Sequence, residues 1–454
     1  MIKKNFVILG AGISGLTTAY LLQKKGYSVT VFEARGDPGG TMISEFHNRF
    51  LIDYGPNSTL ETTPLIREIV NDIGLGNELV YANKEAKKRY ILRNGKLHPL
   101  PMNPFSLITT DLFSFRGKLR LLKEPFIKKS NTSDESIADF VRRRLGNEFL
   151  DYAINPFVSG VYAGDPEKLS VKFAFPKLFE LEERYGSLIK GGIFGKKERQ
   201  KRKETSKSHA RMFSFMNGMQ SFPRAIAKKL GNSVEYNTTV TSCQKENDRF
   251  KIFYTKGEGT NSLHADIVIS TVPAYVASKI FESFDRNLSF HLNQIYYPPV
   301  MTLFLGFNRK DIRHDLDGFG FLIPEKEHKT FLGAIWNSAI FPNRTSEDKA
   351  SFTLFIGGAR MPHVFEMEKT KLIEIVISEF KEIMNIPADP ILIQNKLWKQ
   401  AIPQYNIGYH EHEEYFIKFE QKNSGLFLSG NYRGGISIGD CIKNAGTLIN
   451  IIID

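Results

Sequence analysis

The stretch FVILGAGISG, residues 6–15, decides how the chain begins to fold. Four apolar residues in a row are typical of a strand buried on both faces of a parallel sheet. Gly10, Gly12 and Gly15 then follow with the G-x-G-x-x-G spacing. In such a turn the first glycine permits the tight bend, the second lets a pyrophosphate approach the backbone, and the third lets helix pack on strand. The stretch, including Ala11, Ile13 and Ser14, therefore predicts a dinucleotide-binding turn.

The residues after this turn complete the dinucleotide-binding pattern. A helical pattern runs from Leu16 to Lys25, and a second strand, residues 27–32, ends on Glu33. An acid at this place accepts hydrogen bonds from ribose hydroxyls, while the helix N-terminus favours the phosphates. Arg35 could suggest the 2′-phosphate of NADP, but Glu33 would repel that group. We therefore expect NAD or FAD in a Rossmann-type domain.

Two further turns favour FAD. The sequence DPGGT, residues 37–41, resembles the second glycine pair of FAD-binding flavoenzymes of the monoamine oxidase type, with Gly39, Gly40 and Thr41 in register. Those enzymes carry a basic residue where this chain has Asp37, so one polar contact to the phosphates departs from the pattern. The turn GPNS, residues 55–58, is of the type that lies against an isoalloxazine ring. An ordinary β-turn is its alternative interpretation.

Composition restricts the class of protein. A chain of 454 residues with 41% apolar and 24% charged residues predicts a soluble globular protein of two or three domains. No run approaches the roughly 20 apolar residues of a membrane span, and no signal peptide precedes the first strand. Cys243 and Cys441, far apart in sequence, favour a reducing compartment, so we expect the cytoplasm. Cys441 lies near an expected helix start, where a lowered pKa is conceivable; a buried packing cysteine is the favoured interpretation.

The net charge of +12 is concentrated in one segment. Residues 196–211 hold eight Lys or Arg against two Glu, which is half of the excess. The favoured interpretation is a solvated loop, followed by contact with an anionic membrane or substrate. Nucleic acid is disfavoured because no aromatic residues interleave the basic ones. His410-Glu411-His412 is interpreted as a solvated acidic loop, so no metal is expected.

Several stretches together resemble the oxygen-dependent protoporphyrinogen/coproporphyrinogen oxidase family of haem biosynthesis. They include GAGISGL, GPNS, the expected hairpin KKRYILRNGKLHPLP with Asn94-Gly95 at its turn, NPFVSGVYAGDPEKLSV, DGFGFLIP, AIPQYNIG and GNYRGGISIGDCI. They occur in family order from end to end of the chain. The resemblance implies an α/β fold: a discontinuous Rossmann-type FAD-binding domain, a mixed α/β substrate domain, and an inserted helical domain that associates with a membrane surface.

Domain bounds and site residues follow from this resemblance. We expect the FAD-binding domain at 1–85, 212–272 and 405–454, the substrate domain at 86–104 and 273–404, the helical domain at 105–195, and the basic loop at 196–211. FAD contacts are implied for Gly10, Ala11, Gly12, Ile13, Ser14, Gly15, Glu33, Ala34, Gly39, Gly40, Thr41, Gly55, Pro56, Asn57, Ser58, Val240, Gly430, Asn431, Ile436, Ser437 and Ile438. Substrate contacts are implied for Arg89, as the propionate-binding arginine, and for the walls Phe157, Gly160, Phe319, Leu322 and Phe355.

The resemblance also implies the reaction. It is the six-electron oxidation of a porphyrinogen, with three hydride transfers to FAD, reoxidation by O2 and release of hydrogen peroxide. No catalytic side chain is expected, because the flavin carries the chemistry. The compact stretch Asp317–Leu322 favours protoporphyrinogen, and coproporphyrinogen is the alternative. Another flavin oxidase of the superfamily and a non-catalytic, partner-binding protein of this fold are more distant alternatives. The sequence does not indicate an oligomeric state.

Overall fold

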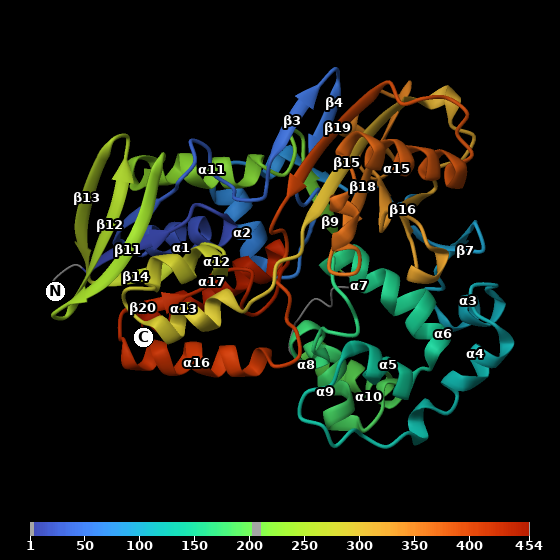
Figure 1. Cartoon of the computed structure of the whole chain (residues 1–454), viewed down its shortest axis with the longest axis horizontal. Helices are drawn as coiled ribbons and strands as arrows, with labels where there is room; N and C mark the ends of the chain where they lie inside the picture. The colour runs from blue at the N-terminus through green and yellow to red at the C-terminus, as the bar shows by residue number, and fades with distance from the viewer. Residues whose placement is uncertain (1–3, 202–209, 454) are drawn as a thin grey trace.

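The computed structural model describes residues 4–201 and 210–453, and Figure 1 shows how its parts are arranged. A five-stranded sheet with its helices forms one side of the molecule, and a seven-stranded sheet forms the other. A group of helices from the middle of the chain lies beneath the seven-stranded sheet in this view. In the described part of the chain, none of the helices is both long and apolar enough to cross a membrane.

The five-stranded sheet is parallel and gathers strands from distant parts of the chain. Its order is β10-β2-β1-β14-β20, with the bounds β1 Asn5–Leu9, β2 Ser28–Phe32, β10 Val234–Glu235, β14 Ile267–Ser270 and β20 Leu426–Leu428. The helices α1 (Ile13–Lys24) and α17 (Ile438–Ile453) pack against each other beside it. Also in this half are α2 (Pro64–Asp72), α11 (Ser221–Leu230), α12 (Ala274–Phe281), α13 (Arg286–Asn293) and α16 (Tyr409–Lys422). The carboxyl ends of the strands therefore meet at one edge, where this class of sheet binds ligands.

The seven-stranded sheet has one covered face. Its order is β19-β15-β18-β17-β16-β7-β8, with β7 Lys88–Arg93, β8 Lys96–Pro99, β15 Val300–Asn308, β16 Gly318–Leu322, β17 Gly333–Trp336, β18 Lys349–Gly357 and β19 Leu392–Trp398. Leu372, Val376 and Phe380 of α15 (Lys369–Met384) pack on one face in a continuous apolar cluster. The opposite face is turned toward the rest of the molecule and carries the expected substrate residues. The short helix α14 (Asn337–Ile340) links β17 to β18.

Smaller sheets complete the β structure. They are the hairpin β3–β4, the antiparallel sheet β5-β9-β6 and the meander β11-β12-β13. Their strands are, in that order, Ser44–His47, Phe50–Asp53, Thr59–Leu60, Met212–Phe215, Leu79–Tyr81, Thr238–Glu246, Arg249–Lys256 and Gly259–Ala265. The expected hairpin at residues 87–101 is confirmed as β7 and β8, with Asn94 and Gly95 in left-handed conformations at its turn.

The middle of the chain is helical. It contains α3 (Pro104–Thr109), α4 (Phe115–Leu121), α5 (Ile137–Arg144), α6 (Asn147–Phe149), α7 (Asn155–Tyr162), α8 (Val171–Ala174), α9 (Pro176–Tyr185) and α10 (Leu188–Lys201). The fully buried guanidinium of Arg144 in α5 forms ion pairs with Glu182 of α9 and with Glu124 of the short turn Glu124–Phe126. The division of the chain into domains remains a prediction.

Two predicted loops are helical instead. The basic segment was expected to be a loop from residue 196, but α10 continues to Lys201, because Lys, Arg, Glu and Gln are good helix formers. Its residues 202–209 lie outside the described residues. The expected acidic loop around His410 is the first turn of α16, which buries Tyr409, Phe416 and Phe419 along one side.

Candidate active site

The turn between β1 and α1 has a shape that only glycine permits. Gly10 has a φ of +98°, and a Cβ on Gly15 would overlap the carbonyl oxygen of Gly10. A Cβ on Gly12 would have no neighbour within 4 Å, so space lies open above it. No described side chain caps the N-terminus of α1, and its first turn carries no acidic residue. This helix end, with Ile13 and Ser14 in its first turn, fits the pyrophosphate of a dinucleotide.

Glu33 joins this turn to the strand β11. Its Oε2 accepts a hydrogen bond of 2.8 Å from the backbone N–H of Ala11. Its carbonyl accepts one of 2.8 Å from the N–H of Thr238, two residues before Val240. The carboxylate is nearly buried but keeps further acceptor positions, which suit ribose hydroxyls. The structure therefore brings Glu33, the adjoining Ala34 and Val240 to the same edge of the sheet.

The second glycine pair lies directly on the first turn. The N–H of Gly39 donates to the carbonyl of Ala11 at 2.9 Å, and a Cβ on Gly40 would lie 3.6 Å from the Cα of Gly12. A Cβ on Gly55 would overlap the carbonyl oxygen of Thr41, so the turn 55–58 adjoins this pair in turn. These contacts place three glycine-rich segments in one cradle that side chains would fill.

Asp37 stands where the related flavoenzymes have a basic residue, and its carboxylate binds side chains of the protein. It accepts hydrogen bonds from Nε2 of Gln220 at 2.7 Å and from Nε of Arg224 at 3.1 Å. Both partners belong to α11 or its N-cap. The acid therefore ties the loop to α11, and Arg224 balances its charge near the cradle.

The tail of the chain closes the cradle from the other side. After β20, Gly430 takes a φ of +126°, and Ser437 caps α17 by accepting a 3.1 Å hydrogen bond from the N–H of Asp440. Between these points the hydroxyl of Tyr405 donates to the carbonyl of Asn431 at 2.7 Å and accepts from the N–H of Gly435 at 3.0 Å. Tyr405 thus fixes the loop that leads to Ile436, Ser437 and Ile438.

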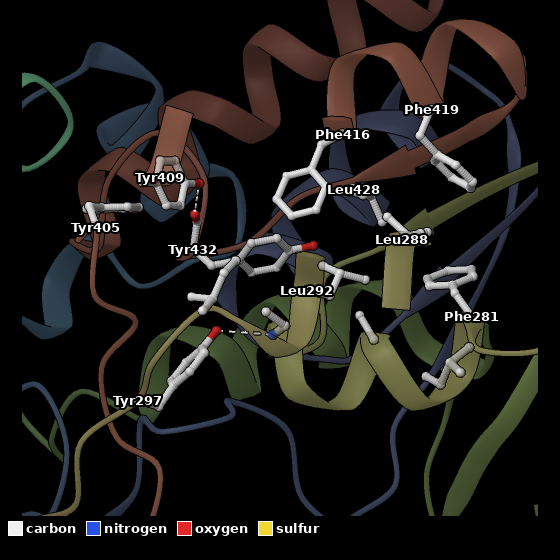
Figure 2. Packing of buried hydrophobic residues seen from close by; sticks show 14 of the residues in the cluster. Phe281, Leu288, Leu292, Tyr297, Tyr405, Tyr409, Phe416, Phe419, Leu428 and Tyr432 are labelled. Atoms are coloured by element: carbon white, nitrogen blue, oxygen red, sulfur yellow. Dashed lines mark hydrogen bonds between the residues drawn. The ribbon is translucent and has the colours of Figure 1, made fainter. Parts of the chain in front are cut away.

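Residues next to this loop belong to the core. Figure 2 shows Tyr432 among buried apolar side chains, with the hydroxyl of Tyr409 donating to its carbonyl. Arg433 is held by Glu413 and Glu420, with N–O distances of 2.6 and 2.7 Å. Cys441 is buried, and burial raises the pKa of its thiol to about 11. It is therefore a packing cysteine, as the sequence favoured.

The expected substrate walls lie on the face of the seven-stranded sheet that is turned toward the rest of the molecule (Figure 1), and on the helix α7, which contacts that face. Leu322, Gly333 and Phe355 are direct neighbours across three strands. A Cβ on Gly160 of α7 would overlap the Leu322 side chain, so helix and sheet are in close contact there. Phe157, on the same helix, is 40% exposed and packs near Phe175 at a ring separation of 5.9 Å.

Arg89 lies at the edge of this wall. Its guanidinium stands over the ring of Phe319, 5.5 Å from the ring centre. Partial desolvation lowers the pKa of Arg89, and no carboxylate of the described residues acts on it. The side chain is exposed, so a cation without a counter-charge is accessible beside aromatic and aliphatic walls. This arrangement suits a large apolar molecule that carries a carboxylate at its edge.

Two residues of the site were not found from the sequence. Tyr405 lies in the stretch AIPQYNIG, which contributed only to the family resemblance. In the structure the hydroxyl of Tyr405 bridges Asn431 and Gly435 of the tail loop. Arg344, whose Nη2 donates to the carbonyl of Asn57 at 2.9 Å, carried no signal in the sequence.

Comparisons with known proteins agree with this geometry. The family model for flavin containing amine oxidoreductases matches residues 13–446. A chloroplastic protoporphyrinogen oxidase from Oryza sativa subsp. japonica is 36% identical, with 98% of this chain and 87% of the relative covered. A coproporphyrinogen III oxidase from Bacillus subtilis is 28% identical over 99% of this chain and 97% of its own. A crystal structure from Exiguobacterium sp. shares the fold with a TM-score of 0.82 at 21% identity, covering 100% of this chain and 99% of that one.

Proposed function

Because the chain belongs to the flavin-containing amine oxidoreductase family, we propose that it oxidises protoporphyrinogen IX to protoporphyrin IX with O2 as acceptor. It is an FAD-dependent oxidoreductase, and the cradle formed by residues 10–15, 39–41, 55–58 and 430–438 would hold the cofactor. FAD supplies the hydride acceptor, and its reoxidation by O2 yields hydrogen peroxide. The side chains of the protein bind, orient and enclose the substrate.

Arg89 is the observation that carries the proposal. Its guanidinium offers a planar pair of donors for a propionate carboxylate, in a place where Phe319 already screens one side from water. Leu322, Phe355 and Gly160 form the apolar surface against which the tetrapyrrole ring would lie. Anchoring one edge of the ring would hold the substrate in a fixed geometry, and a fixed geometry lowers the barrier to hydride transfer.

The charges along β7 favour a substrate with few carboxylates. Lys88 is paired with Asp317, and Arg93 is paired with Glu148. Of the cations on this strand, Arg89 alone has no ion pair with a described residue. Coproporphyrinogen carries four propionates and would favour a more basic surface, so it is the second candidate, supported by the Bacillus subtilis relative.

A substrate comparison tests this function. The purified protein, loaded with FAD, is mixed with protoporphyrinogen IX or coproporphyrinogen III, and porphyrin fluorescence is followed in air. We expect faster porphyrin formation from protoporphyrinogen, together with hydrogen peroxide. No gain over a flavin-free control with either substrate would refute porphyrinogen oxidation, and a faster rate with coproporphyrinogen would reverse the substrate assignment.

We also propose that an anionic lipid surface binds the helices α3 and α4 together with α10. Large apolar side chains on these helices and on the residues that flank α3 and α4 are strongly exposed: Met102, Phe105, Ile108, Phe115, Leu122, Phe126, Ile193 and Phe194, each at least 64% exposed. Arg116, Lys118, Arg120 and Lys123 lie among them in the sequence. Apolar insertion combined with basic residues is typical of peripheral binding to anionic lipid.

Flotation with phosphatidylserine-containing vesicles tests the membrane proposal. We expect the wild-type protein to float with the vesicles, and the double variant Phe105→Ser/Phe126→Ser to lose most of that binding. Phe46→Ser/Phe290→Ser is the matched control, since Phe46 and Phe290 are 61% and 58% exposed elsewhere on the surface. Equal flotation of the two double variants would contradict the assignment of this surface.

A further inference from the structure

A buried ion pair lies beside the turn 55–58. Nη2 of Arg344 is 2.8 Å from Oδ2 of Asp53, and each side chain is only 2% exposed. Burying two charges carries a large desolvation cost, which an ion pair often fails to offset. A buried ion pair is therefore weak evidence that its only role is to stabilise the fold. The hydrogen bonds that the pair makes to neighbouring segments indicate a further role.

Arg344 reaches the turn itself. The same Nη2 donates to the carbonyl of Asn57 at 2.9 Å and to the hydroxyl of Ser214 at 2.6 Å. Asn337, seven residues earlier, accepts a hydrogen bond of 3.3 Å from the side chain of Asn57. The connection between β17 and β18 thus holds Asn57 through both its backbone and its side chain.

Asp53 fixes the segment that leads into the same turn. Its Oδ1 accepts from the N–H of Met219 at 3.0 Å and from the hydroxyl of Ser44. Burial raises the pKa of Asp53 and lowers the pKa of Arg344, so each charge depends on its partner. Asp53 lies two residues before Gly55, and the guanidinium of Arg344 binds Asn57, two residues after Gly55.

We propose that Arg344 and Asp53 are positioning residues that fix the turn 55–58 against the flavin ring. The inference rests on the proposed function, which places this turn on the cofactor. Arg344 belongs to a connection of the seven-stranded sheet, so the pair links the seat of the flavin to the sheet that carries the substrate walls. The flavin environment should therefore respond to a substitution that touches neither cofactor nor substrate.

The test compares two buried arginines in the FAD-loaded protein. Arg344→Lys keeps the charge but loses the guanidinium nitrogen Nη2 that binds Asn57 and Ser214. Arg144→Lys is the matched control, because Arg144 is fully buried and ion-paired with Glu124 at 3.1 Å within the helical part of the chain. We expect both variants to melt at a lower temperature. Arg344→Lys alone should shift the visible flavin absorbance and release FAD about tenfold faster, as loss of a charge-assisted hydrogen bond implies.

Each outcome decides the proposal. An unchanged flavin spectrum and FAD release in Arg344→Lys, or equal changes in both variants, would overturn it. If Arg344→Lys does not fold, Asn337→Ala replaces it, since this change removes the second hold on Asn57 without exposing a buried charge. Porphyrin formation by the wild-type protein is measured in parallel: its absence refutes the proposed function, whereas an active wild type with an unresponsive Arg344→Lys refutes only the positioning role.

Discussion

Arg89 differs from other arginines of the structure in what faces its guanidinium. Arg144 lies between Glu124 and Glu182, and Arg433 lies between two glutamates of α16. The guanidinium of Arg89 faces the ring of Phe319, and desolvation lowers the pKa of Arg89 without an opposing carboxylate. A bound carboxylate would offset this desolvation. A ligand with a carboxylate therefore gains binding energy at Arg89, because no carboxylate of the described residues already pairs with this guanidinium.

Replacing Arg89 tests this point. Arg89→Ala should raise KM for protoporphyrinogen by about 10- to 100-fold, the effect of losing a hydrogen-bonded charge pair. Arg89→Lys should retain part of the affinity, because it keeps the charge but not the planar fork. Steady-state rates and the flavin absorbance at 450 nm are measured on the same samples. Loss of FAD from Arg89→Ala would show that the residue serves the cofactor and not the substrate.

Residues with a role in local backbone geometry could be predicted from the sequence, and residues defined by distant partners could not. Gly10, Gly12 and Gly15 predict their turn because the requirement for residues without a Cβ arises within the turn itself. Arg344 acts on Asn57, 287 residues away in the chain, and nothing in its neighbourhood indicates that contact. Tyr405 is similar, since its role depends on where the tail loop returns.

At the scale of elements, two helices are joined by a histidine pair. Nδ1 of His291 on α13 lies 2.9 Å from Nδ1 of His412 on α16, and Tyr415 stacks on His291 at a ring separation of 4.3 Å. A hydrogen bond of this kind needs one donor and one acceptor nitrogen, so at least one ring must be neutral and the pair cannot hold two extra protons. Desolvation lowers the pKa of each histidine, although Glu411 and Asp285 act in the opposite direction on His291.

Stability should therefore fall in mild acid. Unfolded histidines take up protons near pH 6.5, whereas the folded pair resists protonation until lower pH. The unfolded state binds more protons in that window, so the free energy of unfolding decreases as pH drops below about 6.5. We expect Tm to be lower at pH 5.5 than at pH 7.5, and His412→Gln to weaken this dependence. An identical pH slope in the variant would exclude the histidine pair as its cause.

Some helices carry a strong periodicity in the sequence and others do not. In α15 the buried residues Leu372, Val376, Phe380 and Met384 recur every four residues, so the pattern indicates a helix. The helix α11 is harder to predict, because it is short and has Pro223 in its first turn. In α16 the charged stretch His410-Glu411-His412 suggests a loop, while Phe416 and Phe419, which are buried with Tyr409 in this helix, follow only later in the sequence.

At the scale of the whole molecule, the cradle is assembled from parts that lie hundreds of residues apart. The turn after β1, the strand β11 and the loop before α17 meet at the carboxyl edge of the five-stranded sheet. Thr271 ties the end of β14 to the first turn by donating to the carbonyls of Leu9 and Gly10 at 2.8 and 3.1 Å. A ligand in this cradle would contact segments from distant parts of the chain at once, so its binding acts on the global fold.

Removing FAD should consequently destabilise the entire chain. A ligand that binds only the folded state stabilises it by about 2.7 kcal/mol at a free concentration of 100 Kd, and Tm should rise with added FAD. Arg89→Ala is the matched control, because its FAD-dependent shift should equal that of the wild type if Arg89 serves only the substrate. Melting of the apo and reconstituted proteins is followed at several FAD concentrations. A Tm that does not change with FAD would show that the three segments do not close on a common ligand.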